Sequence, residues 1–596
     1  MKFILQLFNR REKVQMFGIF LLMLISGFLE MVGLGMIFPF IGMVTNPKII
    51  HENNLLDFFY DILSFQSVQN FLIAFGIALI FLLVIKNIYY FLSMFIQQNY
   101  LIRKRVQIGN LLYSGYLRSD YNFHLQHNSA LLLRNTSVVD NIFAGGLQPL
   151  FLILSETVIV VFVLAMLLFT NYLITICAAL FIIPLVWVIY SMFRVRLRGL
   201  GKESHKLMGL TSKAILESFG AIKEVLVKNC QDYFSREYEE NTKKLGIIRR
   251  DNFILTQTPR LVLEPIVAGS LILLIVFFIL KGKVGSDVFP TIAMFATASF
   301  RLVVSATKIV TAMHTLDFNR VLEDTICKEL KLFIQNSEKD NLKEGKLVYT
   351  KKASFNSTIE LRNISFRYSG GNNDAVRNVS LTINKGQSIA FVGASGAGKS
   401  TLIDIFLGLL SPCVGEICVD GENIFKCLST WRSNIGYVPQ DSFLRDDTLR
   451  HNIAFAIPDH IIDDKALRKA LNAAQLSDFV ETLPQGVNTI IGERGIRLSG
   501  GQRQRLNVAR ALYSDPNILV MDEATSALDG ETEAEISRAV ENLSGEKTII
   551  IIAHRLSTVK KCDCVYFMVD GEIHDSGTLQ ELLQRNDKFN KVAGLR

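Results

Sequence analysis

Long runs of apolar residues dominate the first 320 residues of the chain. Six are found, at residues 14–44, 68–97, 142–170, 172–193, 254–280 and 285–316. Since a helix rises about 1.5 Å per residue, each run is long enough to cross a hydrocarbon core of roughly 30 Å. The pattern therefore predicts six membrane-spanning helices. No signal-peptide cleavage pattern follows the first run, so we expect this helix to be retained.

Basic residues gather on one side of these predicted spans. They precede the first and fifth spans and follow the second and fourth, at Arg10, Arg11, Lys13, Arg103, Lys104, Arg105, Arg194, Arg196, Arg198, Arg249 and Arg250. Because cytosolic loops carry the excess of Lys and Arg, this bias predicts a multi-pass protein with both termini in the cytosol. We interpret the net charge of +8 in the same way, and so expect no nucleic-acid partner.

Two long connections on the cytosolic side, residues 98–141 and 194–253, carry helical periodicity instead of turn residues. We expect the membrane helices to continue through them into the cytosol. Short turns are predicted at their tips, within 122–139 and 218–224. These turns either contact an attached domain or take part in ordinary helix packing. On the outer side, residues 54–63 predict an amphipathic helix, whose apolar face contains Leu55, Phe59, Ile62 and Leu63. This helix lies on the bilayer interface or binds a lipid-borne substrate.

Four basic residues lie inside the predicted spans, at Lys86, Arg260, Arg301 and Lys308. Burying a charge in lipid is costly, so such residues usually face a cavity or a partner. Arg301 and Lys308 are seven residues apart and therefore share a helix face. Several cations at cavity-facing positions predict an anionic substrate, for which a phosphate or pyrophosphate headgroup is a natural candidate.

Three of these residues have a simpler interpretation. Arg260 and Glu264 are four residues apart on one predicted helix, so they can neutralise each other. Lys86 and Lys308 have side chains long enough to extend to the lipid headgroups. Arg301 is the hardest to explain by either alternative.

The pattern changes after residue 320. Residues 321–357 are polar and charged, which is typical of a linker. Beyond them, strands are predicted at 359–364, 518–522 and 548–552 and a hairpin turn at Asp420-Gly421. We therefore expect an α-helical transmembrane domain at 1–320, a linker at 321–357 and an α/β domain at 358–596.

The composition fits this division. Charged residues make up 20% of the chain and the mean hydropathy is +0.31, which is unlike a soluble protein and indicates that much of the chain lies in lipid. A chain of 596 residues is too long for a single core, so two or more domains are expected. The eight cysteines contain no CxxC pair and no metal-ligand spacing, which predicts reduced cytosolic thiols.

A glycine-rich loop follows an apolar run in the α/β domain. Its residues are Gly393, Ala394, Ser395, Gly396, Ala397, Gly398, Lys399, Ser400 and Thr401. Because glycine has no Cβ, successive N–H groups can converge on phosphate oxygens, and a helix beginning at Lys399 adds its positive dipole end. Lys399 is expected to reach the β and γ phosphates of ATP, and the Ser400 hydroxyl to bind Mg²⁺.

Two acidic residues end the predicted strand at 518–522. Asp522 is expected to hold Mg²⁺, partly through water, and Glu523 is expected to polarise the water that attacks the γ phosphate. Together with the glycine-rich loop, this acid pair predicts an enzyme that hydrolyses ATP.

Between these motifs, Leu498-Ser499-Gly500-Gly501-Gln502 matches the signature of the ABC transporters, and the chain is identified as a member of that family. The resemblance implies further roles. These are Tyr368 for stacking on adenine, Gln440 for sensing the nucleotide and its Mg²⁺, Glu493 for contact with a coupling helix, Asp529 in the D-loop, and His554 for contact with the γ phosphate.

The signature also has implications for assembly. In this family, the equivalents of Ser499 and the glycine N–H groups of Gly500 and Gly501 form a second phosphate cradle, which closes on the nucleotide of the other subunit. One ATPase domain and six spans are half of the family's complement. The resemblance therefore implies a homodimer with two ATP sites.

Parts of the membrane half, at 26–41, 259–264 and 300–308, resemble the PglK-type lipid-linked oligosaccharide flippases, whose external helix corresponds to residues 54–63. This resemblance implies an exporter of the bacterial inner membrane that moves an anionic polyprenyl-pyrophosphate glycan to the outer leaflet for protein glycosylation. A peptide, drug or lipid A exporter with the same ATPase is the alternative. A soluble ABC ATPase of DNA repair or translation shares the nucleotide motifs but needs no six spans.

Overall fold

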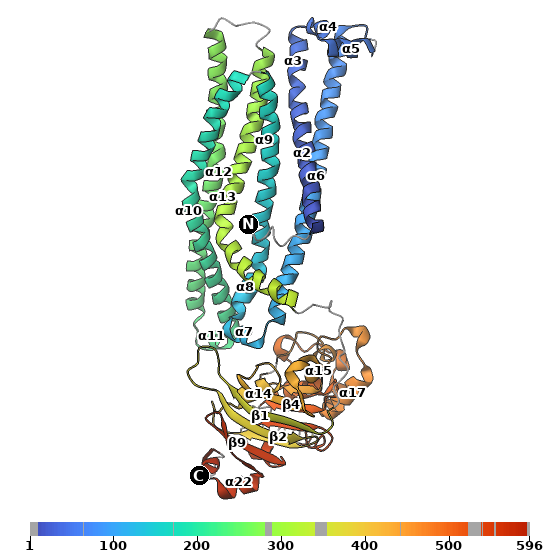
Figure 1. Ribbon diagram of the computed structural model, residues 1–596, viewed down its shortest axis with the longest axis vertical. Coiled ribbons are helices and arrows are strands. Elements are labelled where there is room, and N and C mark those ends of the chain that lie inside the picture. The colour runs from blue at the N-terminus through green and yellow to red at the C-terminus, as the bar shows by residue number, and fades with distance from the viewer. Residues whose placement is uncertain are drawn as a thin grey trace. The chain divides into compact units, whose positions relative to one another are not determined.

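The computed structural model describes residues 10–62, 65–170, 172–280, 289–339, 355–441, 443–522, 538, 540–553 and 556–592. The chain divides into two compact units. The first contains Met1–Ser119 and His124–Leu342, and the second contains Asp120–Phe123 and Lys343–Arg596. Figure 1 shows that the first unit is helical and that the second combines strands with helices.

Long helices make up the first unit. They are α2 (Arg10–Gly35), α3 (Ile37–Thr45), α6 (Val68–Arg118), α9 (Gln148–Thr170), α10 (Tyr172–Gly220), α12 (Gln231–Leu280) and α13 (Phe289–Lys339). Within the described residues, four segments are long and apolar enough to cross a membrane, namely Arg10–Thr45, Val68–Arg118, Phe143–Thr170 and Ile292–Arg320. Each of the four overlaps a predicted span. The remaining two apolar runs lie within α10 and α12.

Four of these helices are much longer than a membrane is thick. Helices α6, α10, α12 and α13 contain 51, 49, 50 and 51 residues, which corresponds to roughly 75 Å at about 1.5 Å per residue. This confirms that the helices continue through the predicted cytosolic connections. At the predicted tips the chain forms short helices, α7 (Tyr121–Gln126), α8 (Ser129–Ile142) and α11 (Ile222–Val227), and a π-helix at Phe143–Leu147 leads into α9.

The first predicted span is not one continuous helix, because it is interrupted at Met36 between α2 and α3. Pro39 is the third residue of α3. A proline has no N–H to donate, and it is tolerated in a first helical turn because the N–H groups there have no intrahelical partner. The interruption at Met36 therefore lies where Pro39 cannot donate the helical hydrogen bond to the carbonyl oxygen of Gly35.

The predicted amphipathic helix is observed as α5 (Asn54–Ile62), which follows the short helix α4 (Ile49–Glu52). Leu56 is buried, whereas Phe59 and Ile62 of the predicted apolar face are exposed. For the other two residues predicted for this face, Leu55 and Leu63, the structure does not describe the side chains. An exposed apolar face on such a helix is suited to contact with lipid.

Helices α2 and α9 approach each other closely at Gly27. A Cβ built on Gly27 would lie 2.8 Å from Val158 and 2.9 Å from Phe162 of α9. With any larger residue, the Val158 and Phe162 side chains or the helices themselves would have to shift, because real Cβ atoms essentially never make contacts this short. This contact lies less than one turn before Glu30 on α2.

Two sheets form the second unit. The first is antiparallel, in the order β2-β1-β4-β5, and consists of β1 (Thr358–Phe366), β2 (Val376–Asn384), β4 (Val414–Val419) and β5 (Glu422–Asn423). The second has the order β10-β9-β3-β8-β7-β6 and consists of β3 (Ser388–Val392), β6 (Ile435–Val438), β7 (Ile518–Asp522), β8 (Thr548–Ile552), β9 (Cys564–Val569) and β10 (Glu572–Gly577). The three predicted strands are therefore confirmed. The predicted hairpin turn joins β4 to β5, with φ angles of 49° at Asp420 and 87° at Gly421.

Helices accompany these sheets. They are α14 (Lys399–Phe406), α15 (Leu428–Arg432), α16 (Leu449–Ile453), α17 (Asp464–Ala473), α18 (Ser477–Thr482), α19 (Gly500–Leu512), α21 (Leu556–Val559), α22 (Leu579–Arg585) and α23 (Asp587–Val592). Every residue of β3 and β8 is buried, which explains the unbroken apolar runs in the sequence, since central parallel strands are covered on both faces. The predicted fold class, a helical transmembrane domain with an α/β domain, is confirmed.

Candidate functional site

The glycine-rich loop (residues 393–401) connects β3 to α14 in the second unit. Gly396 and Gly398 have positive φ angles of 83° and 93°, which residues with a Cβ rarely adopt. A Cβ on Gly398 would also lie 2.4 Å from the carbonyl oxygen of Ala375, and a Cβ on Gly393 would lie 2.3 Å from that of Met568. The loop therefore needs its glycines both for backbone conformation and for space.

Lys399 is the first residue of α14, and it is buried. Its Nζ donates hydrogen bonds to the carbonyl oxygens of Gly393 and Ala394, at 2.9 and 3.0 Å. The ammonium group thus lies against the loop at the N-terminal end of a helix, where the helix dipole also favours an anion. This arrangement is suited to binding phosphate groups.

The remaining residues of the loop, and Tyr368 beside it, are also predicted to bind the nucleotide. Ala394, Ser395, Gly396 and Ser400 are exposed, whereas Ala397 and Thr401 are buried. The Tyr368 hydroxyl lies 3.0 Å from Oγ1 of Thr401, and the Tyr368 ring meets that of Phe366 edge to face at 5.0 Å between centroids. These contacts hold the ring that is predicted to stack on adenine beside the start of α14.

Other predicted residues follow neighbouring strands of the same sheet. Strands β3, β8, β7 and β6 are adjacent and parallel, so their carboxyl ends lie at one edge, where α/β proteins bind ligands. The glycine-rich loop follows β3, Asp522 ends β7, and Gln440 lies two residues beyond β6. Glu523, Asp529 and His554 lie outside the described residues.

Oxygen atoms at this edge fit Mg²⁺. This ion usually binds one or two carboxylates together with phosphates of the nucleotide, and Asp522 and Ser400 offer a carboxylate and a hydroxyl. Burial, and after it the negative charge of Asp522, raise the pKa of Asp404 to about 6. A carboxylate that is buried beside a second acidic group in this way favours a bound cation. In the part of the chain that the structure describes, no group of three or more His, Cys, Asp or Glu side chains is arranged to hold a metal ion by itself.

The signature residues begin α19. Ser499 is the N-cap, and it forms a capping box with Gln502, since each side chain accepts a hydrogen bond from the other residue's backbone N–H. Ser499 and Gly500 are exposed, Gly501 is buried, and a Cβ on Gly500 would meet nothing within 4 Å. The capped helix start is therefore open to a further ligand.

Arg510, near the end of α19, has a role that the sequence analysis missed. Its guanidinium donates to the carbonyl oxygens of Asn452 and Phe443, at 2.7 and 2.9 Å, and lies over the Phe455 ring at 4.8 Å from the centroid. Burial lowers the pKa of Arg510 to about 10. Because Phe443 comes three residues after Gln440, Arg510 joins the signature helix to the segment that follows Gln440. No local motif signals this long-range pair.

In the first unit, three of the four predicted basic residues belong to one cluster of charges. Lys86 Nζ lies 2.8 Å from one carboxylate oxygen of Glu30, and Arg301 Nε lies 2.6 Å from the other. The exposed fractions of these side chains are only 12, 16 and 17% for Lys86, Arg301 and Glu30. Glu30 is the single acidic residue in the apolar run at 14–44, and the sequence analysis assigned it no partner.

The same cluster extends to α9 through Glu156, which is completely buried. Its carboxylate lies 2.6 Å from Lys308 Nζ and 3.3 Å from Arg301 Nη1. Ser305 accepts a hydrogen bond from Arg301 at 3.0 Å and donates one to Glu156 at 2.8 Å. Sequence analysis missed Glu156, although it is a single acid in the run at 142–170. We call Glu30, Lys86, Glu156, Arg301, Ser305 and Lys308 the membrane ion network, which joins α2, α6, α9 and α13. Figure 1 labels these four helices in the first unit.

Arg260 is not part of the membrane ion network among the described contacts. Its Nε lies 2.7 Å from Oε1 of Glu264 on the same helix, α12, and the two side chains are 62 and 47% exposed. The neutralising pair that the spacing offered as an alternative is thus observed.

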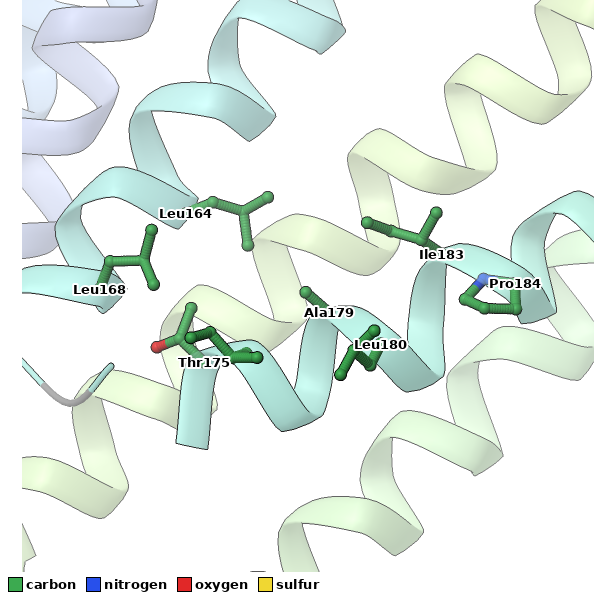
Figure 2. Close-up of a pocket in the computed structure, with 8 residues that line it drawn as sticks. Leu164, Leu168, Thr175, Ala179, Leu180, Ile183 and Pro184 are labelled. Carbon is green, nitrogen blue, oxygen red and sulfur yellow. The ribbon is translucent and has the colours of Figure 1, made fainter. Parts of the chain in front are cut away.

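An apolar cavity of about 360 Å³ lies elsewhere in the first unit. Figure 2 shows Leu164 and Leu168 of α9 facing Ala179 and Ile183 of α10 around it. Its lining contains none of the four basic residues. It therefore suits a hydrocarbon chain and not a charged headgroup.

Comparison with known proteins extends over most of the chain. Residues 376–526 match the family described as ABC transporter. An "ATP-dependent lipid A-core flippase" of Paraburkholderia xenovorans is 32% identical over 457 residues, which cover 76% of this chain and 74% of that protein. A protein of the same name from Coxiella burnetii is 31% identical over 490 residues, or 81% and 80% of the two chains.

Two further similarities support more limited conclusions, one because it covers less than half of the chain and the other because its sequence identity is low. The "Heterocyst differentiation ATP-binding protein HepA" of Nostoc is 40% identical over 265 residues, which cover 44% of this chain and 43% of that protein. A solved structure of a bacterial Atm1-family ABC exporter with ATP bound matches with a TM-score of 0.77 and covers 98% of this chain and 99% of its own, at 20% sequence identity. At that identity the match supports the fold alone.

Proposed function

Because the chain belongs to the ABC transporter family, as an exporter half-transporter of the type that includes the lipid A-core flippases, we propose that it moves an anionic glycolipid from the cytosolic to the outer leaflet. It is an ATP hydrolase that couples hydrolysis to transport. The proposed substrate is of the lipid A class, in which a phosphorylated saccharide carries acyl chains. Relatives with that substrate in their name support this choice over the polyprenyl-pyrophosphate glycan of the sequence analysis.

The observation that carries the proposal is the membrane ion network. Lys86, Arg301 and Lys308 lie inside apolar helices that belong to a membrane exporter. Such residues usually mark a substrate pathway. Arginine and lysine are also the side chains that best bind phosphate groups. We therefore assign these three residues, and not the separate Arg260, to the path of the headgroup.

We propose that two copies of the chain form a homodimer that binds two ATP molecules. The glycine-rich loop and Lys399 hold the phosphates of one nucleotide, and Ser499 with the N–H groups of Gly500 and Gly501 binds it from the other copy. Tyr368 stacks on adenine. Gln440, Asp522 and Ser400 would hold Mg²⁺, which neutralises charge on the phosphates when it is bound.

Glu523 is the proposed base that polarises the attacking water, with His554 and Asp529 beside the γ phosphate. Binding of ATP would close the ATPase pair and hydrolysis would reset it. We expect the protein in the bacterial inner membrane with both termini in the cytosol, given its basic connections. The proposed domains are 1–320 for transport, 321–357 as linker and 358–596 for ATP.

A polyprenyl-pyrophosphate glycan is the second candidate substrate. It carries the same phosphate chemistry, and helix α5, with exposed Phe59 and Ile62, offers an apolar face on the proposed outer side for a long lipid chain. Both candidates therefore enter the same test.

The test measures ATP hydrolysis by the purified full-length protein in nanodiscs with diphosphoryl lipid A, with a polyprenyl-pyrophosphate oligosaccharide, or with neither. We expect lipid A to stimulate the wild type several-fold, Arg301→Ala to lose that stimulation, and the matched variant Arg260→Ala to keep it. Stimulation by the polyprenyl lipid alone would move the assignment to the second candidate. Undiminished basal hydrolysis that responds to neither lipid would overturn the anionic glycolipid.

A further inference from the structure

The membrane ion network contains two carboxylates that an anion-binding path does not require. Glu30 and Glu156 come from α2 and α9, while the cations come from α6 and α13. Each carboxylate repels a phosphate and costs free energy to bury. Their presence beside cations that face a transported anion therefore needs its own explanation.

The charges of the network alternate along a single chain of contacts. Lys86 meets Glu30, Glu30 meets Arg301, Arg301 meets Glu156, and Glu156 meets Lys308. Among the described residues the network thus has three cationic side chains and two carboxylates, which leaves an excess of one positive charge. The carboxylates fix the positions of long, flexible cationic side chains and cancel most of their charge.

The two ends of this alternating chain differ in exposure. Lys308 is 39% exposed, whereas Lys86 at the other end is 12% exposed. The Lys308 ammonium has three N–H donors. Its nitrogen lies 2.6 Å from Oε1 of Glu156 and 6.0 Å from the centroid of the Tyr90 ring. Lys308 is therefore the end of the network that an anion reaches first.

We propose that Glu156 is a specificity-determining counter-ion, which holds Lys308 in place for the phosphate group of a lipid and weakens the binding of that phosphate enough for release. A transporter must bind its cargo firmly enough to collect it and loosely enough to let it go. A neutral residue at position 156 would raise the excess from one positive charge to two. The phosphate would then bind more tightly and leave more slowly. This inference rests on the proposed transport of a phosphate-bearing lipid.

The experiment compares Glu156→Gln with the wild type in two measurements on the full-length protein. Native mass spectrometry measures binding of diphosphoryl lipid A, of dephosphorylated lipid A and of phosphatidic acid. ATP hydrolysis in nanodiscs gives the lipid concentration for half-maximal stimulation and the maximal rate. Glu239→Gln is the matched control, because Glu239 forms an exposed ion pair with Lys243 on α12, where both side chains are more than half exposed.

We expect Glu156→Gln to bind phosphate-bearing lipids about tenfold more tightly and to lower the half-maximal concentration and the maximal rate together. Dephosphorylated lipid A should bind both proteins equally. The double variant Glu156→Gln/Lys308→Gln restores the excess of one charge and should return the affinity to near the wild-type value. A residue with only a structural role would lower the melting temperature and leave the affinity of folded protein unchanged.

Each outcome bears on the inference separately from the substrate. If phosphatidic acid binds more tightly to Glu156→Gln while lipid A does not bind at all, Glu156 acts as proposed and the lipid A class is wrong. If lipid A stimulates the wild type and Glu156→Gln alike with equal affinity, the substrate stands and the role of Glu156 is wrong. Should Glu156→Gln not fold, Lys308→Gln replaces it, with an expected tenfold loss of affinity for both phosphate-bearing lipids; no loss would refute the proposal.

Discussion

The glycine-rich loop of the second unit and the membrane ion network of the first both present positive charge suited to phosphate, yet they are built differently. The loop uses nine consecutive residues and largely backbone groups, with one ammonium, that of Lys399. The network uses side chains of four helices, and its ion pair between Glu30 and Arg301 joins residues 271 apart in the chain. One site is local, and the other exists only when the bundle is packed.

Because of this difference, the two sites tolerate amino-acid substitutions differently. Backbone N–H groups are present whatever the side chain, so the loop depends on conformation and space, which its glycines provide. Buried side-chain charges must be balanced against one another, because an unpaired charge in an apolar environment is costly. We therefore expect substitutions in the loop to affect chemistry and substitutions in the network to affect stability as well.

The largest effect is expected for Arg301→Ala. It leaves Glu30 and Glu156 without their shared cation and should lower the free energy of unfolding by about 3–5 kcal/mol. The melting temperature of the detergent-solubilised protein measures this loss. Arg260→Ala, which breaks an exposed pair, should cost about 1 kcal/mol or less. Equal losses in the two variants would contradict the idea that the network stabilises the bundle.

Lys399→Ala tests the loop. Removal of the ammonium that contacts Gly393 and Ala394 should lower the rate of ATP hydrolysis by about 100-fold. Release of inorganic phosphate measures the rate. Lys385→Ala, at an exposed lysine between β2 and β3, is the control and should hydrolyse ATP normally. A rate for Lys399→Ala close to that of the control would remove the loop from the active site.

Asp404 tests whether charge balance also matters near the loop. Its pKa is raised to about 6 by burial and then by Asp522, so the folded protein keeps a proton that the unfolded chain loses above about pH 4. Stability should therefore fall as the pH rises from 4 to 6, and Asp404→Asn should stabilise the protein at pH 7 by on the order of 2 kcal/mol. Melting temperatures at pH 5 and pH 7 measure this. A variant that melts below the wild type at pH 7 would show that the carboxylate is needed instead.

The smallest effect on stability is expected at His451, which lies between two carboxylates and is more exposed to solvent than the side chain of Glu156. His451 lies 2.7 Å from Asp447 and 2.8 Å from Asp459, and these carboxylates, Asp447 first, raise the pKa of the imidazole. A raised histidine pKa stabilises the fold below about pH 6.5, and this stabilisation is lost as the pH rises through the folded-state value.

His451→Gln should therefore cost about 1 kcal/mol at pH 6 and almost nothing at pH 9. The difference in melting temperature from the wild type at each pH measures the cost. His460→Gln, at an exposed histidine in the same region, serves as the control. A loss for His451→Gln that is equal at both pH values would assign the effect to packing and not to charge.

The sequence was most informative where structure is local. The phosphate-binding role of residues 393–401 could be predicted from their order in the sequence, and the long helices could be predicted from apolar runs. Both features depend on residues that are neighbours in the chain. The sequence analysis also placed Arg301 and Lys308 on one face of a helix, and both now contact Glu156. It did not find Glu156 or Arg510, because their partners lie 145 or more and 55 or more residues away, respectively.

Other features depend on packing that no spacing reveals. Gly27 of α2 lies against Val158 and Phe162 of α9, more than 130 residues away in the chain, and no sequence spacing predicts this contact. The interruption at Met36 follows from one proline, which the apolar pattern alone conceals. Glu523, Asp529 and His554 remain predictions from sequence, since they lie outside the described residues.

The capping box at Ser499 has a consequence for how the signature meets a nucleotide. A serine hydroxyl has one hydrogen to donate and two lone pairs to accept. The cap occupies a lone pair of Oγ, which accepts from the N–H of Gln502. The hydroxyl hydrogen is not used by this bond. Ser499 can therefore donate it to a phosphate oxygen while the first turn of α19 stays capped, so arrival and departure of nucleotide need not fray the helix.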